Sequence, residues 1–71
     1  MSQDKLVRMV NQIATFFATQ PGDDGADRVA AHLTDFWDPR MRGQLLEIAG
    51  EGEHGLSPLA LAATERLRHG T

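Results

Sequence analysis

The stretch Phe36-Trp37-Asp38-Pro39-Arg40-Met41-Arg42 decides the fold, because it places a helix end and a helix start within a few residues. Asp38 precedes a proline, which biases the backbone of Asp38 away from helical angles. Pro39 suits the first position of a new helix, where its missing N–H costs nothing. Asp38 is therefore predicted to end one helix and to cap the next.

Apolar residues recur at helical spacing on both sides of this junction. The preceding helix is predicted to open in the turn Asp23-Asp24-Gly25, where either aspartate is expected to accept hydrogen bonds from free amides. Its stripe consists of Ala26, Val29, Ala30, Leu33, Phe36 and Trp37. The following helix is predicted over residues 39–49, and the glycine-rich, acidic residues 50–55 after it are expected to form a mobile loop.

The two outer segments also have helical patterns. Residues 2–20 carry an apolar stripe, Ser2 suits the N-cap, and Pro21-Gly22 ends the helix. Ser57-Pro58 opens the last helix with a cap followed by proline. No strand-like alternation occurs in the sequence. The chain is predicted to be all-α, a small bundle of about four short helices forming one domain over residues 1–71.

Composition narrows the function. A chain of 71 residues buries only about 60% of the surface that its unfolded form exposes. It has no cysteine, which excludes disulfides and thiolate-held metals. Burial against another protein is the remaining way to add stability.

The net charge of −3 does not favour binding to nucleic acid or to an anionic membrane. No apolar run could span a bilayer, and the N-terminus lacks a secretory signal, so we expect a cytoplasmic location.

Two apolar faces are wider than one helix seam requires. Val7 and Phe16 broaden the first stripe, and large residues crowd the junction. Such surfaces usually mark contact sites. Phe17 and Phe36 are interpreted first as core residues, whereas Trp37 fits the core and an interface equally well. The predicted partner-binding set is Phe16, Phe36, Trp37, Pro39, Arg40, Met41 and Arg42, in which Arg40 and Arg42 would meet carboxylates or carbonyls of a partner.

Catalytic, cofactor-binding and metal sites are not expected in this chain. His32 and Asp35 share a helix, but His54 and His69 lack ligand spacing. The aspartates cluster at helix starts, where capping explains them. Asn11 and Gln12 lie within the first helix; one is expected to face solvent and the other to bond a neighbouring helix end or a subunit boundary.

Two other functions compete with a dedicated subunit. One is a generic helical adaptor. The other is a helix-turn-helix DNA-binding regulator that uses Arg40 and Arg42, although residues 40–71 carry four arginines against four glutamates and are neutral.

Three blocks of the sequence resemble the delta subunit of cytoplasmic NAD-dependent formate dehydrogenases. The first is Lys5-Leu6-Val7-Arg8-Met9-Val10-Asn11-Gln12-Ile13-Ala14 with Phe16-Phe17. The second is Val29-Ala30-Ala31-His32-Leu33 followed by residues 36–42, and the third is Leu56-Ser57-Pro58-Leu59. The Phe-Trp-Asp-Pro-Arg-Met core is the most specific part.

The resemblance implies a non-catalytic accessory subunit of a multisubunit oxidoreductase. In that complex the large subunit holds a molybdenum bis-pyranopterin and iron–sulfur clusters, and other subunits carry FMN and the NAD site. Formate is oxidised to CO2 and the electrons pass to NAD+. The delta subunit holds none of these groups, and the resemblance implies that it supports assembly, cofactor insertion or stability of the enzyme. Our own hypothesis is that it docks on the large molybdenum subunit through residues 36–42 and the face around Phe16.

Overall fold

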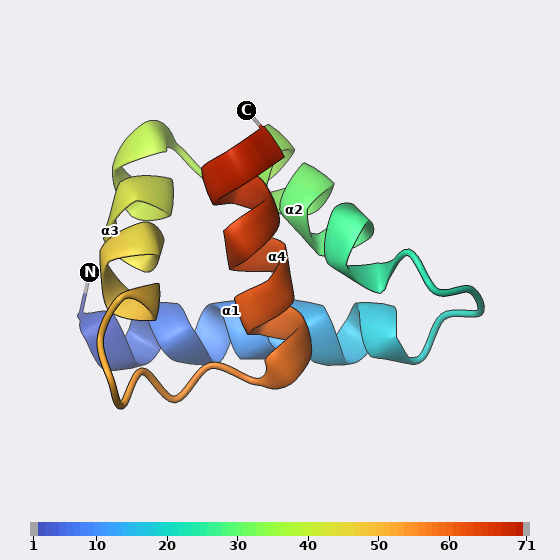
Figure 1. Cartoon of the computed structure of the whole chain (residues 1–71), viewed down its shortest axis with the longest axis horizontal. Coiled ribbons are helices and arrows are strands. Elements are labelled where there is room, and N and C mark those ends of the chain that lie inside the picture. Colours follow the sequence, from blue (N-terminus) through green and yellow to red (C-terminus); the bar gives the residue numbers. More distant parts are fainter. Residues whose placement is uncertain (1, 71) are drawn as a thin grey trace.

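The computed structural model describes residues 2–70, and over that range the chain forms four helices joined by loops (Figure 1). They are α1 (Gln3–Ala18), α2 (Gly25–Phe36), α3 (Pro39–Ala49) and α4 (Pro58–Gly70). The predicted all-α fold is confirmed, and α3 begins and ends at the predicted residues.

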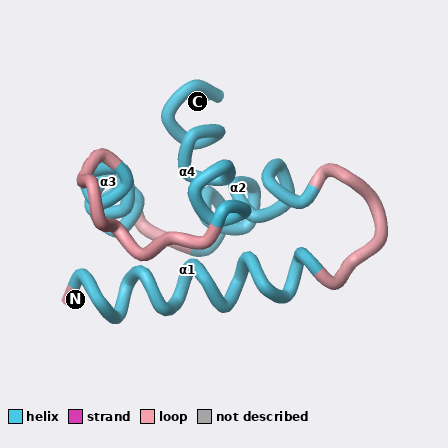
Figure 2. The backbone as a smooth tube through the Cα atoms, turned by 60° about the horizontal axis from the view of Figure 1, so that its bottom comes forward, coloured by secondary structure: helices cyan, strands magenta, loops and turns pink. Residues whose placement is uncertain are grey.

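The helices are not arranged as four parallel rods. In Figure 2, α1 runs along one side of the molecule, and the other three helices all lie on the same side of it. The last helix, α4, packs most extensively against α2 and also contacts α1 and α3. It is therefore the element around which the other helices gather.

Predicted caps explain where three helices begin. The Ser2 hydroxyl accepts a hydrogen bond from the Lys5 amide at 3.2 Å, and an Asp38 carboxylate oxygen accepts one from the Met41 amide at 2.8 Å. At the start of α4, the Ser57 hydroxyl accepts a bond from the Ala60 amide at 3.2 Å.

The predicted aspartate cap of α2 is wrong. Asp24 occupies the N-cap position, but its side chain makes no capping hydrogen bond. Its backbone has ψ of 24°, whereas the capping residues Ser2 and Asp38 have the extended backbone that turns a side chain toward the free amides. The Asp24 carboxylate instead accepts a hydrogen bond from Nε of Arg28 at 3.1 Å.

The core lies where α4 meets the other helices. Its buried residues come from every helix and from the segments next to α3: Leu6, Val10, Ala14, Val29, Leu33, Trp37, Leu45, Ile48, Leu56, Ala60, Ala63 and Leu67. The buried Thr64 hydroxyl donates to the Ala60 carbonyl oxygen at 2.8 Å, which satisfies it within α4.

The loop between α3 and α4 is fastened to α1 by side chains. Asn11 donates to the Gly55 carbonyl oxygen at 3.0 Å and accepts from the Ser57 amide at 2.9 Å. Gln3 adds a hydrogen bond to Glu51 at 2.9 Å. The expectation that Asn11 bonds a neighbouring helix end is confirmed, since Ser57 caps α4, and Gln12 is exposed as expected.

Candidate partner-binding surface

Four aromatic side chains form a continuous strip across α1 and α2, which we call the aromatic strip: Phe16, Phe17, His32 and Phe36. Phe16 and Phe17 meet edge to face with ring centroids 5.2 Å apart. The Phe17 ring lies 6.0 Å from the His32 ring, and the His32 ring lies 4.7 Å from that of Phe36. The strip therefore joins two helices that are separate in the sequence.

The two ends of the aromatic strip are open to solvent. Phe16 is 59% exposed and Phe36 is 74% exposed, while Phe17 and His32 between them are half-buried. An exposed phenylalanine is unfavourable in water, and a contiguous exposed apolar patch usually marks a contact site. Phe16 and Phe36 are the large hydrophobic side chains that the fold leaves exposed among residues 2–70.

A shallow depression adjoins the aromatic strip. It has a volume of about 410 Å³ and is lined by Met9, Gln12, Ile13, Phe16, Phe17 and His32. His32 is the one titratable group in this lining. The depression can therefore receive apolar side chains of a partner while offering an imidazole at its edge.

The neighbours Phe36 and Trp37 lie on opposite sides of the chain. Phe36 is the last residue of α2, and Trp37 adopts an extended backbone with φ of −95° and ψ of 140°. This turn places the indole in the core, where Trp37 is only 6% exposed. The expectation that Phe36 belongs to the core is wrong, because the turn carries Trp37 inward in its place. Phe17 does pack against the core as expected.

Arg42 bonds backbone carbonyls within its own chain. Its guanidinium Nη1 donates to the carbonyl oxygens of Leu33, Thr34 and Trp37, all at the C-terminal end of α2. A cation in this position satisfies unpaired carbonyls and complements the helix dipole. The structure thus gives Arg42 a role in joining α3 to α2, and its contact with a partner stays a prediction.

The remaining predicted residues lie at the start of α3. Pro39 and Arg40 are exposed and Met41 is half-buried against the core. The Arg40 side chain has no hydrogen bond or ion pair within residues 2–70. The predicted set is therefore divided: Phe16 and Phe36 share one surface, Trp37 lies inside, and Arg42 holds the junction together.

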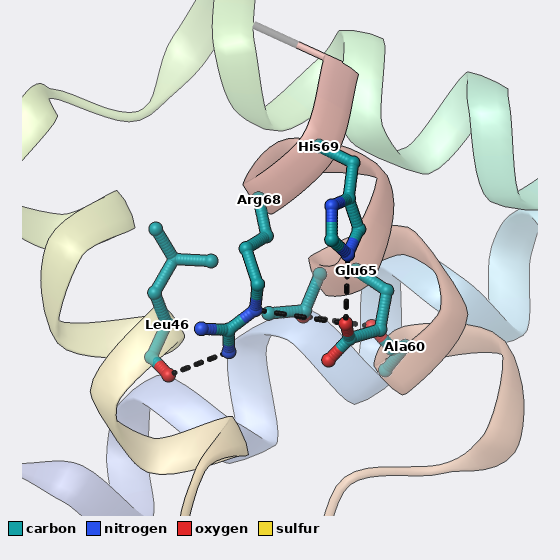
Figure 3. Close-up of polar contacts among 6 residues, drawn as sticks. Leu46, Ala60, Glu65, Arg68 and His69 are labelled. Carbon is teal, nitrogen blue, oxygen red and sulfur yellow. Dashed lines mark hydrogen bonds and ion pairs between the residues drawn. The ribbon is translucent and has the colours of Figure 1, made fainter.

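Polar side chains near the end of α4 form a second cluster, shown in Figure 3. Arg68 donates to the Leu46 carbonyl oxygen of α3 at 3.3 Å and lies 3.6 Å from the Glu65 carboxylate. His69 approaches the same carboxylate at 3.7 Å. The Arg68–Leu46 hydrogen bond ties α4 to α3, whereas the two contacts of Glu65 lie within α4. The cluster therefore serves the fold.

Several other charged groups also have structural partners. Arg66 of α4 pairs with Asp27 of α2 at 3.0 Å. The hydrogen bond from Arg28 holds the pKa of Asp24 below its ordinary value of 3.8. Within residues 2–70, no three His, Asp or Glu side chains gather as metal ligands would. Among the four arginines of residues 40–71, Arg42, Arg66 and Arg68 bond groups of this chain.

The position of His32 between two phenylalanine rings was not predicted from the sequence, where His32 was considered as a metal ligand and set aside. His32 and Phe36 are four residues apart on α2 and so share a helical face. Met9, Ile13 and Phe16, spaced four and then three residues apart, likewise share one face of α1. Those spacings were visible in the sequence, but the crossing of α1 and α2 that brings the two faces together was not.

No helix in the described range is long and apolar enough to cross a membrane. Searches of curated proteins and of solved structures find no match to this chain. The sequence model of the NADH-dependent formate dehydrogenase delta subunit, FdsD, matches residues 5–64, which include α1, α2 and α3 in nearly their full length. This range also contains the aromatic strip and the helix junction. The chain therefore belongs to the formate dehydrogenase delta subunit family.

Proposed function

We propose that this chain is a non-catalytic accessory subunit of a cytoplasmic NAD-dependent formate dehydrogenase. In this proposal it docks on the large molybdenum-containing subunit through the aromatic strip and the exposed start of α3. Docking supports assembly, cofactor insertion or stability of the active enzyme, because a partner that binds only the folded or loaded form stabilises that form.

The observation that carries the proposal is the exposure of Phe16 and Phe36 in a member of a subunit family. Both rings belong to one strip, beside a depression with a mostly apolar lining. Interfaces are enriched in aromatic residues at their buried centres. Arg40 lies four residues beyond Phe36 and is available for a carboxylate or carbonyl at the rim.

The chain has no cysteine, so it supplies no thiolate to an iron–sulfur cluster. In this proposal the clusters, the molybdenum centre, FMN and the NAD site therefore belong to the other subunits. The rival DNA-binding function gains no support from the arginines. Three of the four in the second half of the chain are engaged within the fold, which leaves Arg40 alone of these four to meet a phosphate.

Omission tests the accessory role. All subunits are produced together with and without this chain, and the purified complexes are compared for subunit stoichiometry, molybdenum content and formate-dependent reduction of NAD+. We expect the complex made without the chain to lose molybdenum content or stability. A complex that forms, carries full molybdenum and turns over formate without the chain would refute the assembly role.

Substitution tests the docking surface. Phe16→Ser and Phe36→Ser replace exposed rings, so they should weaken copurification with the large subunit while leaving the fold intact. Phe16→Leu and Phe36→Leu are the matched controls, since they retain apolar bulk. Undiminished copurification of the double serine variant would show that the partner binds elsewhere.

A further inference from the structure

The loop between α3 and α4 is held by side chains at three consecutive residues. It runs along α1 before it turns into α4 (Figure 1). Asn11 binds the Gly55 carbonyl oxygen and the Ser57 amide. Between these two residues, the Leu56 amide donates to Nδ1 of the half-buried His54 at 3.0 Å. Leu56 is only 8% exposed and belongs to the core, so the imidazole holds the residue that anchors this loop.

The hydrogen bond from Leu56 requires one protonation state of His54. Nδ1 can accept only in the neutral ring that carries its proton on Nε2, because an imidazolium has an N–H on both nitrogens. A second proton would set the Nδ1 N–H against the N–H of Leu56 and break the bond. Histidine is the side chain that ordinarily gains this proton between about pH 8 and pH 5. A change of pH in this range can therefore remove the contact.

The other side chains that fasten this loop do not depend on a proton in this way. The amide of Asn11 does not titrate, and its oxygen accepts at any pH. Glu51 accepts a hydrogen bond from Gln3, and a carboxyl group can accept in both of its protonation states. Among these fastenings within residues 2–70, the bond to His54 is the one that a proton on the acceptor abolishes.

No charged group forms an ion pair with His54 within residues 2–70. The first turn of α4 contains no charged residue. The charged side chains nearest to the imidazole along the loop, and on the turns of α1 and α3 beside the loop, are Glu51, Glu53, Asp4, Arg8 and Glu47. None of these carboxylates accepts an N–H of the ring in the folded chain, so none replaces the bond to Leu56 when the ring is protonated.

We propose that His54 is a proton-sensitive latch for the start of α4. The neutral ring holds the Leu56 amide and keeps the Leu56 side chain in the core. When the ring gains a second proton the latch opens, and Asn11 alone fastens residues 54–57 to α1. Because α4 contacts all three other helices, loosening at its start reaches the core. The inference goes beyond the proposed docking function and does not depend on it.

Amide hydrogen exchange of the full chain, followed by NMR, tests the latch. The quantity compared is the protection factor of the Leu56 amide, which is the ratio of its intrinsic to its observed exchange rate. It is measured at about pH 7.5 and about pH 5.5, on either side of the ordinary titration of histidine. In the wild type we expect the protection factor to fall about fivefold or more at the lower pH. An unchanged protection factor would overturn the latch.

Two substitutions at His54 separate the proton from the hydrogen bond. In His54→Asn, the side-chain oxygen can accept from the amide two residues on and does not titrate. Its Leu56 protection factor should stay within about twofold between the two pH values. His54→Ala removes the acceptor, so its Leu56 amide should be poorly protected at both.

His69→Asn is the matched control, because it removes an exposed imidazole near the other end of α4. This variant should keep the wild-type fall in protection at the Leu56 amide. A fall that persists in His54→Asn, or that disappears in His69→Asn, would show that the proton acts at another group and would refute the latch.

Discussion

The Arg42 guanidinium of α3 donates a hydrogen bond to the carbonyl oxygen of Trp37, the C-cap residue that follows α2. It also reaches the Leu33 and Thr34 carbonyls. One side chain thereby satisfies the end of one helix from the second turn of the next. The helix junction is held by this cation and by the Asp38 cap rather than by apolar contact alone.

Arg42→Ala should destabilise the chain by about 1.5–3 kcal/mol, because it removes charged hydrogen bonds from carbonyls at a helix end. For a domain of this size, each kcal/mol lowers the melting temperature by about 4–8 °C. Thermal unfolding followed by circular dichroism measures the loss. Arg40→Ala is the control, and its effect should stay within about 0.5 kcal/mol; equal effects of the two variants would contradict the bridging role.

Asn11→Ala should loosen the loop that leads into α4. The substitution removes the bonds to Gly55 and Ser57 together, and we expect a cost of about 1–3 kcal/mol. Hydrogen exchange should speed up at the Ser57 amide. Gln12→Ala changes the exposed neighbouring amide and should be nearly neutral. Similar exchange rates at the Ser57 amide in both variants would show that the Asn11 hydrogen bonds do not hold the loop.

The neighbouring aromatics at the junction should respond in opposite ways to truncation. Trp37→Ala removes a buried indole and should cost about 3–5 kcal/mol, which is comparable to the whole stability expected of so small a domain. Phe36→Ala should change stability by less than about 0.5 kcal/mol. Since Trp37 is the one tryptophan, its fluorescence should show a buried indole that becomes exposed on unfolding. Emission typical of a solvated indole in the native chain would contradict this placement.

The Asp24–Arg28 pair should make a small contribution to stability that depends on pH. The hydrogen bond from Arg28 lowers the pKa of Asp24 from 3.8 in the folded chain. A carboxyl with a lowered folded-state pKa stabilises the fold above its unfolded-state value, and that stabilisation is lost as the pH falls through the folded value. Asp24→Asn should therefore lower the melting temperature at neutral pH and have no effect in strong acid. Asp23→Asn alters the same charge one residue earlier, and an identical pH profile would refute the assignment to the pair.

Local rules predicted much of this fold. Ser2, Asp38 and Ser57 cap helices as their positions indicate, and α3 has the predicted limits. The predicted side-chain cap at Asp24 was wrong because capping requires an extended backbone, which the acidic turn does not adopt. The backbone conformation of Asp24 depends on how α1 and α2 are connected, and the spacing of residues in the sequence does not predict it.

The candidate surface was harder to predict than the helices. Phe16 was correctly placed among residues that the core cannot hold, but the pattern could not tell which of Phe36 and Trp37 would turn inward. The answer depends on the backbone angles of Trp37. His32 gained its position from the crossing of α1 and α2, which is a tertiary property.

The extended residue at the end of α2 also makes the length of the junction critical. Because adjacent side chains leave it in opposite directions, inserting or deleting one residue there would turn the indole outward and a phenyl ring inward. Either change would disturb the hydrophobic core and the aromatic strip together. We expect variation in length to be better tolerated around Gly52 in the loop after α3, which is exposed and where a Cβ would meet no atom within 4 Å.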